Sequence, residues 1–213
     1  MAPFIAFDVE TTGLPKSRNA KFSNLNAYEE CRLLSVAVVE FDNDFNEVGC
    51  YYKIIKPEGY PVKATEIHGI TQEKADQEGE SFENVMTDIL FMFSNVSCIV
   101  GHNIGFDTNV LASEMVRRNL KTDFLDDLEQ VCTLKMCKNI FYRRINLSDL
   151  YFKLFNKKFI GAHNALADAR AAAEVFIELK KTVLEPKPIK AKKVWLKVSE
   201  VANMIGVSPF KPQ

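Results

Sequence analysis

The chain contains few of the features that would indicate a disulfide framework, a structural zinc site or a membrane span. Its five cysteines among 213 residues are scattered and include no C-x-x-C pair, which argues against structural zinc and favours a reducing compartment. No apolar run reaches the roughly 18 residues of a membrane-spanning helix. The N-terminal MAPFIAFDVE has no basic segment and indicates neither a signal nor a transit peptide. We therefore expect an intracellular protein, cytoplasmic or nuclear, without a membrane partner.

The net charge of −1 is unevenly distributed. Residues 180–213 contain eight lysines and two glutamates, a net charge of +6, which leaves −7 for residues 1–179. The basic segment could add sequence-independent attraction to phosphate, or it could be a solvated lysine-rich linker. An acidic body does not exclude a nucleic-acid enzyme, because bound divalent cations invert the local charge.

The order of the expected elements predicts an α/β fold with a mixed sheet of about five strands flanked by helices. Alternating or continuous apolar residues predict strands over 4–9, 33–41, 49–55, 97–100 and 130–133. Helical spacing and capping residues predict helices over 82–93, 106–119, 147–155 and 165–181, with a short one possible over 71–75. Residues 16–30 read as a long loop, and 42–47 as a hairpin loop.

The composition also predicts the domain boundaries. Residues 1–181 should form one domain, and residues 182–193, with two prolines and no periodicity, a linker. Residues 194–213 resume a globular pattern, with Ser199 capping a short helix to Ile205. Twenty residues cannot hold a core alone, so this segment either packs on the main domain or begins a truncated second one.

Two carboxylates end the first expected strand. Asp8 and Glu10 share one face because strand side chains alternate, and they could hold a pair of hard cations. An exposed alternating strand would give the same spacing, but the flanking residues are too apolar for that. In the turn that follows, Thr11 and Thr12 precede Gly13, which permits positive φ and close approach of a nucleotide; the next residue, Leu14, is either a wedge against a terminal base or an ordinary core leucine.

Two further carboxylates are expected in the first turns of helices. Asp107 follows a buried strand within GHNIGFD, where α/β sheets place their sites, although the helix dipole alone would also favour an acid there. Asp168 lies between Ala165 and Ala172 on its helix, so small residues let that helix approach the sheet. His163, in the loop before it, can take a proton from water near neutral pH; an isolated histidine there would more often be a surface residue.

These side chains together suit two-metal phosphodiester hydrolysis. Asp8, Glu10, Asp107 and Asp168 would hold two ions, Mg²⁺ or Mn²⁺ because the ligands are hard oxygens. Such an ion pair activates a water and stabilises the leaving 3′-oxygen. His163 would be the general base.

Four motifs resemble those of the DEDDh branch of the DnaQ-like exonucleases, within the ribonuclease H-like superfamily. They are FDVETTGLP, EIHGIT, GHNIGFD and AHNALADA, at residues 7–15, 66–71, 101–107 and 162–169, and LSDLYFKLF at 147–155 is also similar. The resemblance covers residues 3–181, and the histidine five residues before the last acid marks the h branch. The loop over 16–30 is longer than in the simplest members.

The resemblance implies 3′→5′ exonuclease activity that releases nucleoside monophosphates, with two bound metals. It also implies contacts to the 3′-terminal nucleotide from the backbone of residues 10–13 and from the side chains of Leu14, Ile67, His68, Asn103 and Phe106. His68 has a structural alternative as a turn histidine. For His102 we expect only a local hydrogen bond.

The leading hypothesis is an exonuclease acting on DNA 3′ ends, single-stranded DNA being favoured, in proofreading, repair or recombination. An exoribonuclease that trims RNA and a non-catalytic nucleic-acid-binding module on the same fold are the alternatives, although the intact set of four acids and His163 argues against the second. Residues 198–212 faintly resemble the opening of YqaJ-type viral recombinase nucleases and the first half of a helix-turn-helix. Either likeness would imply a further C-terminal nuclease or DNA-binding domain in a longer parent protein, for which a viral origin is one alternative.

Overall fold

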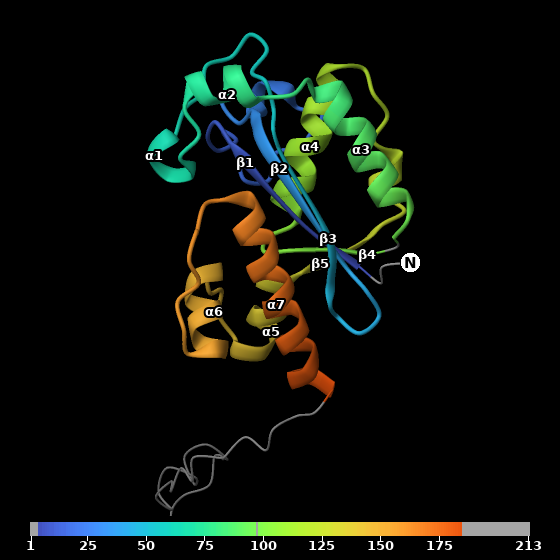
Figure 1. Ribbon diagram of the computed structural model, residues 1–213, viewed down its shortest axis with the longest axis vertical. Helices are drawn as coiled ribbons and strands as arrows, with labels where there is room; N and C mark the ends of the chain where they lie inside the picture. The colour runs from blue at the N-terminus through green and yellow to red at the C-terminus, as the bar shows by residue number, and fades with distance from the viewer. Residues whose placement is uncertain (1–3, 97, 185–213) are drawn as a thin grey trace, which may run out of the picture.

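A five-stranded mixed sheet with the order β3-β2-β1-β4-β5 forms the centre of the molecule (Figure 1). The computed structural model describes residues 4–96 and 98–184. The first three strands are antiparallel neighbours, and β4 and β5 are added in parallel to β1. The strands are β1 (Phe4–Thr11), β2 (Leu33–Phe41), β3 (Glu47–Ile54), β4 (Cys98–Gly101) and β5 (Glu129–Cys132). The predicted α/β class and mixed five-stranded sheet are confirmed.

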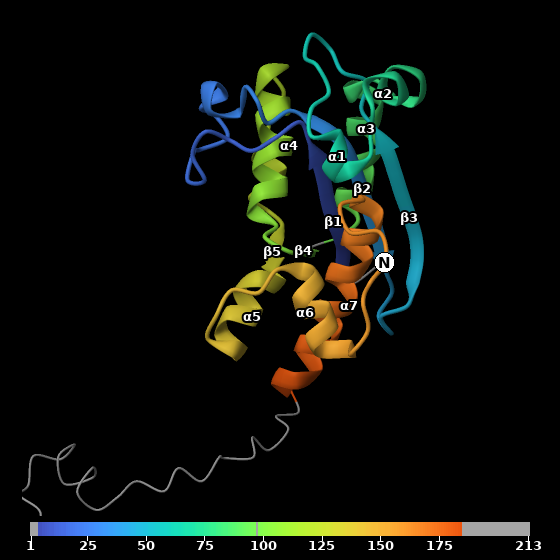
Figure 2. The same ribbon diagram turned by 90° about the vertical axis from the view of Figure 1, so that its left-hand side faces the viewer.

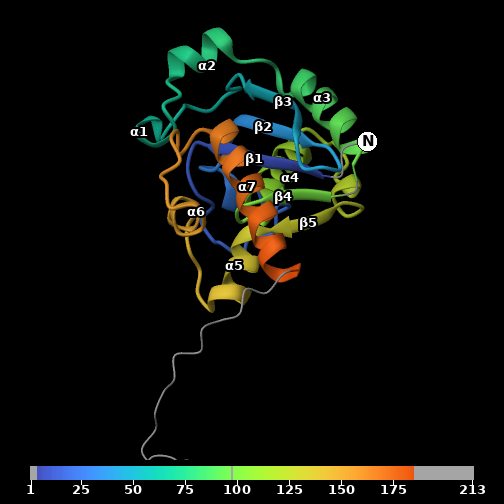
Figure 3. The same cartoon turned by 60° about the horizontal axis from the view of Figure 1, so that its bottom comes forward.

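Helices cover both faces of this sheet (Figures 1 and 3). On one face α3 and α4 pack against β1; on the other, α7 crosses β1 and β2, and α5 and α6 pack on α7. The helices are α1 (Thr65–His68), α2 (Gln72–Glu78), α3 (Phe82–Ser94), α4 (Gly105–Arg117), α5 (Thr133–Phe141), α6 (Leu147–Phe155) and α7 (Ala165–Leu184), with 3₁₀ turns η1 (Leu25–Tyr28) and η2 (Asp123–Leu125). No helix within the described ranges is both long and apolar enough to cross a membrane.

Side-chain alternation along β1 determines where its acids point. Ile5, Phe7 and Val9 are buried in the core beneath α3 and α4. Their neighbour Ala6 belongs instead to the core beneath α7. Asp8 therefore lies on the α7 face, two residues further along the strand.

Alanines let α7 approach that face closely. Ala165, Ala169 and Ala173 are fully buried and pack against Ala6 and Ala37 of the sheet. With only methyl groups at the contact, the helix axis can lie near the strands. The first turn of α7, which carries the expected acid, is thus held beside β1.

Several sequence predictions are met closely and others are not. Ser81 and Asn146 cap α3 and α6, accepting hydrogen bonds from the backbone N–H groups of Asn84 and Asp149. The sequence analysis did not predict α1 or α5, and α7 continues past 181 to Leu184. From 185 onward, which includes most of the predicted linker over 182–193, the segment 194–213 and the helix from Ser199, the chain lies outside the described residues.

Candidate metal centre

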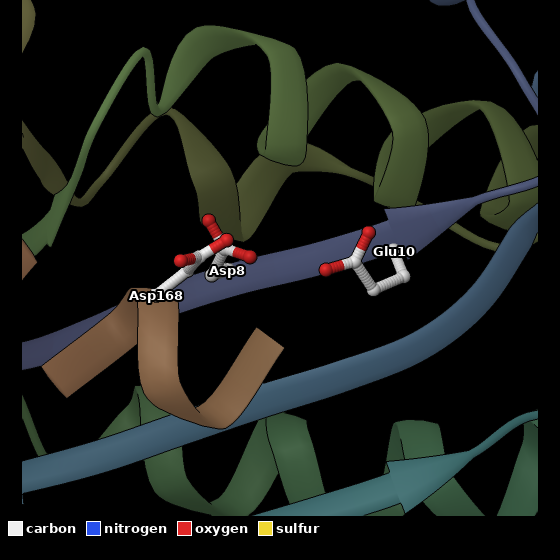
Figure 4. Close-up of side chains that lie close together, drawn as sticks. All are labelled: Asp8, Glu10 and Asp168. Carbon is white, nitrogen blue, oxygen red and sulfur yellow. The ribbon is translucent and has the colours of Figure 1, made fainter. Parts of the chain in front are cut away.

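Three carboxylates from β1 and α7 converge on one point. One oxygen each of Asp8, Glu10 and Asp168 lie within 4.8 Å of one another. Figure 4 shows the Asp8 and Asp168 carboxylates side by side and Glu10 further along the same strand. The spacing of the two acids on β1 and the placement of α7 thus bring the predicted groups together.

Asp107 reaches the same region from the first turn of α4. Its Oδ1 accepts a hydrogen bond from the backbone N–H of Val9 at 3.2 Å, between the two acids of β1. The Asp107 side chain is only 4% exposed. Because β4 is paired with β1 only as far as Ala6, this N–H lacks a partner strand and the carboxylate satisfies it. Asp107 is therefore tied to β1 rather than serving only as a helix cap.

The electrostatics of the cluster oppose ionisation. Burial, and then the charges of Asp107, Asp168 and Glu10, raise the pKa of Asp8 well above its ordinary value. The pKa of Asp107 is also raised, chiefly by burial. Burial and the charge of Asp168 raise the pKa of Glu10 to about 7. Burial raises the pKa of Asp168 to about 6, against a lowering by the nearby His163. Carboxylates in this state need a compensating cation to ionise together.

The turn before α7 connects His163 to this cluster. The backbone N–H of His163 donates to Asp168 Oδ2 at 3.1 Å, and His163 has a left-handed backbone with φ of 65°. Asn164 caps the helix by accepting from the N–H of Ala167 at 3.2 Å. His163 is exposed, so its ring is open to solvent while its backbone contacts Asp168.

The donor set fits divalent cations. Asp168 Oδ1 is buried and has no hydrogen-bond partner in the described chain. Within the part of the chain that the structure describes, none of the four acids forms an ion pair with a lysine or arginine. Hard carboxylate oxygens without a cationic partner are suited to Mg²⁺ and Mn²⁺.

The turn after β1 is fixed by internal hydrogen bonds. Thr12 is buried; its hydroxyl donates to Glu30 O at 2.9 Å and accepts from the N–H of Arg32 at 2.9 Å. Thr11 Oγ1 donates to the Gly13 carbonyl at 2.7 Å. Gly13 does not use the positive φ that the sequence analysis considered. Glycine is needed there because a Cβ would lie 2.8 Å from the Glu30 carbonyl oxygen.

Some of the side chains expected to contact the nucleotide are exposed, and one is already hydrogen-bonded within the protein. Leu14 and Ile67 are large apolar residues that are 69% and 53% exposed. Leu14 is therefore not a core leucine. His68 is 8% exposed, and both ring nitrogens are occupied: Nε2 bonds Lys63 O at 2.8 Å and Nδ1 accepts from the N–H of Ile70 at 3.1 Å. This geometry supports the turn-histidine alternative, in which His68 holds α1 so that Ile67 projects outward.

The remaining predicted positions lie around the start of α4. Asn103 is exposed with φ of 73°, and its carbonyl accepts from the N–H of Phe106, whose ring is half-buried. His102 makes the expected local contact, Nδ1 to Thr133 Oγ1 at 2.9 Å. Burial lowers the pKa of His102 to about 4, so its ring is neutral near pH 7.

A supporting group that the sequence analysis missed is the buried Glu114 of α4. Its carboxylate accepts from Arg32 Nε at 2.5 Å, from Arg32 Nη2 at 3.0 Å and from Arg118 Nη1 at 2.8 Å. Because the Arg32 N–H also binds Thr12, this network joins α4 to the turn after β1. An acid between Ser113 and Met115 in an otherwise apolar part of the helix was the available signal.

Comparisons with known proteins identify a family. The RNase_T family model, described as an exonuclease, matches residues 5–176. The epsilon subunit of DNA polymerase III from Rickettsia conorii is 28% identical over 179 residues, covering 82% of this chain and 72% of that protein. A PolC-type DNA polymerase III from Thermotoga petrophila is 27% identical over 216 residues, covering 99% of this chain but only 14% of the polymerase.

Solved structures share the fold. E. coli Exonuclease I in complex with a dA16 oligonucleotide superposes with a TM-score of 0.66 at 23% identity, covering 85% of this chain and 41% of that one. The nuclease domain of 3′hExo, a DEDDh family member bound to rAMP, has a TM-score of 0.65 at 15% identity, covering 85% and 92%. The ribonuclease H-like fold prediction is confirmed. Because the family model matches most of this chain, the chain belongs to the RNase_T family of exonucleases, as its DnaQ-like motifs predicted.

Proposed function

We propose that this protein is a 3′→5′ exonuclease that removes nucleoside monophosphates from DNA 3′ ends. The observation that carries the proposal is the convergence of Asp8, Glu10 and Asp168 within 4.8 Å, with Asp107 bonded to the strand between the first two. The similarity to DNA polymerase III epsilon supports DNA as substrate and proofreading or repair as the setting. That setting implies an intracellular location.

The four acids would hold two divalent cations, Mg²⁺ or Mn²⁺, which supply an activated water and charge stabilisation for the leaving 3′-oxygen. His163 accepts the proton of the attacking water on a ring nitrogen. Its exposed place before α7 lets it exchange that proton with solvent. The hydrogen bond from its backbone to Asp168 fixes the distance between base and ligand set.

The exposed apolar side chains would position the terminal nucleotide. Leu14 and Ile67 offer surfaces against which the last base can pack, and Phe106 offers a ring face. Thr11, Thr12 and Gly13 form the backbone that approaches the sugar. Thr12 acts through the shape of the turn, because its N–H and hydroxyl are already engaged. For His68 we propose an indirect role through the position of Ile67.

RNA is the second candidate substrate, since 3′hExo, a neighbour in fold, was solved with rAMP.

The decisive experiment compares 5′-labelled single-stranded DNA, the matching RNA and mismatched duplex ends, with Mg²⁺ or Mn²⁺ and with EDTA. We expect stepwise shortening of DNA from the 3′ end, release of nucleoside monophosphates, and no reaction in EDTA. Faster trimming of RNA would overturn the assignment of DNA as the substrate. Binding without cleavage under every metal condition would favour the alternative of a non-catalytic nucleic-acid-binding module. An Asp127→Asn variant, altered at an exposed acid remote from the cluster, should match the native enzyme.

A further inference from the structure

The loop between β1 and β2 forms a second, cationic hollow beside α4. The hollow has a volume of about 530 Å³ and is lined by residues 18–23 of the loop and by Asn109 of α4. Its charged members are Arg18 and Lys21, both exposed. Figure 2 shows this loop on the side of α4 away from α1 and α7.

Among the described residues, neither of these two cations is neutralised by an acidic side chain. Lys63, Arg117 and Arg118 each form an ion pair with a glutamate. In residues 4–96 and 98–184, neither Arg18 nor Lys21 has an ion pair or a side-chain hydrogen bond. In a body whose residues 1–179 carry a net charge of −7, these two cations share one hollow and are available to bind an anion.

The loop is held in place although it is long. Tyr28 Oη donates to the Ala20 carbonyl at 3.1 Å, and the N–H of Lys16 donates to Ala27 O at 2.9 Å. Ala20 and Phe22 pack against the main core. The backbone that carries the two cations is therefore preorganised, which lowers the entropy that binding must overcome.

The hollow adjoins the helix that carries Asp107, α4. Phe106 and Asn109 are three residues apart on α4 and so occupy one face of the helix. Phe106 is the proposed contact to the terminal nucleotide, and Asn109 already lines the hollow. A strand whose 3′ end reaches Asp107 would pass along α4 toward Arg18 and Lys21.

We propose that Arg18 and Lys21 bind the phosphodiester backbone of the substrate strand, upstream of its 3′-terminal nucleotide. This inference rests on the proposed function for the position of the 3′ end. It assigns a role to the loop over 16–30, which the family motifs leave unexplained, and it fixes the side of α4 along which the strand leaves the site. Contacts of this kind are independent of base sequence and strongly dependent on salt.

The test is binding rather than turnover. In a His163→Ala background, which suppresses cleavage, fluorescence anisotropy measures the affinity for labelled thymidine decanucleotide and dinucleotide over a range of salt concentrations. Arg18→Ala with Lys21→Ala should weaken decanucleotide binding about tenfold and reduce the slope of log affinity against log salt by about 1.4, the value for two phosphate contacts to a single strand. The loss for the dinucleotide should be much smaller.

The matched control is Lys56→Ala with Lys74→Ala, which removes two exposed, unpaired lysines outside the hollow. Thermal unfolding checks that both double variants fold, and Arg18→Gln with Lys21→Gln replaces the first pair if it does not. Equal decanucleotide affinity and salt slope in the hollow and control variants would overturn the proposal, as would equal losses for the two lengths. Salt-dependent binding that needs Arg18 and Lys21 in a native chain without hydrolysis would sink the proposed function and leave this inference intact.

Discussion

The carboxylate cluster around Asp8 and the buried carboxylate of Glu114 differ in what surrounds them. Asp8 is surrounded by three other acids, and its pKa is raised by burial and by their charges. Glu114 is only 1% exposed and is more deeply buried than Asp8, which is half-buried. Burial alone would raise its pKa as well, but hydrogen bonds and charges from Arg32 and Arg118 lower it. A carboxylate near Asp8 is therefore suited to binding a metal cation, whereas the Glu114 carboxylate links α4 to Arg32. The difference is that arginine side chains surround Glu114 and, in the described part of the chain, none pairs with Asp8.

The largest expected effect comes from removing the central acid of the carboxylate cluster. Asp8→Asn should lower hydrolysis of labelled DNA by several orders of magnitude, because it removes a carboxylate that would hold the proposed ions. In EDTA the variant should unfold at the same or a higher temperature than the native protein, because the repulsion among the acids is relieved. Calorimetry in EDTA and a gel assay with Mg²⁺ measure the two effects. A lower melting temperature in EDTA would contradict our description of this cluster.

Removing the proposed base should have the next largest effect. His163→Ala should lower turnover at pH 7 by roughly 10²–10⁴-fold, the contribution of a positioned general base. Stabilisation by Mn²⁺, read as a rise in melting temperature, should persist because the four carboxylates remain. Near-native turnover at pH 7 would remove His163 from this role.

Removing Glu114 should lower the stability of the fold rather than the rate of hydrolysis. Glu114→Ala leaves the buried Arg32 guanidinium without its carboxylate, whereas Arg118 keeps its ion pairs with Glu58 and Glu83. We expect the free energy of unfolding to fall by about 3–5 kcal/mol. Chemical denaturation measures this loss, which should be the same with EDTA and with Mg²⁺. Replacing Arg32, Glu114 and Arg118 together by Met, Leu and Met should recover most of it. A Glu114→Ala protein of native stability would show that the network contributes little.

The smallest effect is a pH dependence of metal binding. The pKa values of Glu10 and Asp168 are raised to about 7 and about 6, so without metal the folded state binds more protons than the unfolded state. Stability of the metal-free protein should therefore fall as the pH rises from about 4 to about 7. The rise in melting temperature on adding Mg²⁺ should grow over the same range, because metal and protons compete for the acids.

His102 contributes the opposite slope, since its lowered pKa removes stability as the pH falls below about 6.5. Comparing melting temperatures with and without metal at each pH cancels this contribution. A metal-induced shift that stays constant from pH 5 to pH 8 would contradict the raised pKa values. In Glu10→Gln the growth of the shift should be smaller.

The sequence was most informative where a single local rule determines the structure. The nine apolar-rich residues of β2 identify that strand to the residue, and the alternation in β1 places Asp8 and Glu10 on one face. α1 was missed because it has four residues and starts from Ala64 in a left-handed conformation, without a side-chain cap. α5 was missed because it begins directly after β5 at Cys132, with no turn residue between them.

At the site too, the features that could be predicted are those that a local sequence pattern determines. The four acids could be proposed from the sequence because each lies in a recognisable motif, and strand alternation places Asp8 and Glu10 on one face. The partnership of Glu114 with Arg32 could not, because it joins residues 82 positions apart and no local pattern specifies such a pair. Likewise, the engagement of both His68 ring nitrogens by backbone groups follows from the geometry of one turn.

The shortness of β4 has a consequence for how this fold tolerates change. β4 is bonded to β1 only at Ile5 and Ala6, and Asp107 takes the Val9 N–H beyond that point. One residue added or removed between Gly105 and Asp107 in α4 would rotate the Asp107 side chain about the helix axis by about 100° and carry it out of reach of β1. We therefore expect insertions and deletions to accumulate in surface loops such as residues 42–46, while the length from Cys98 to Asp107 stays constant in any active descendant of this chain.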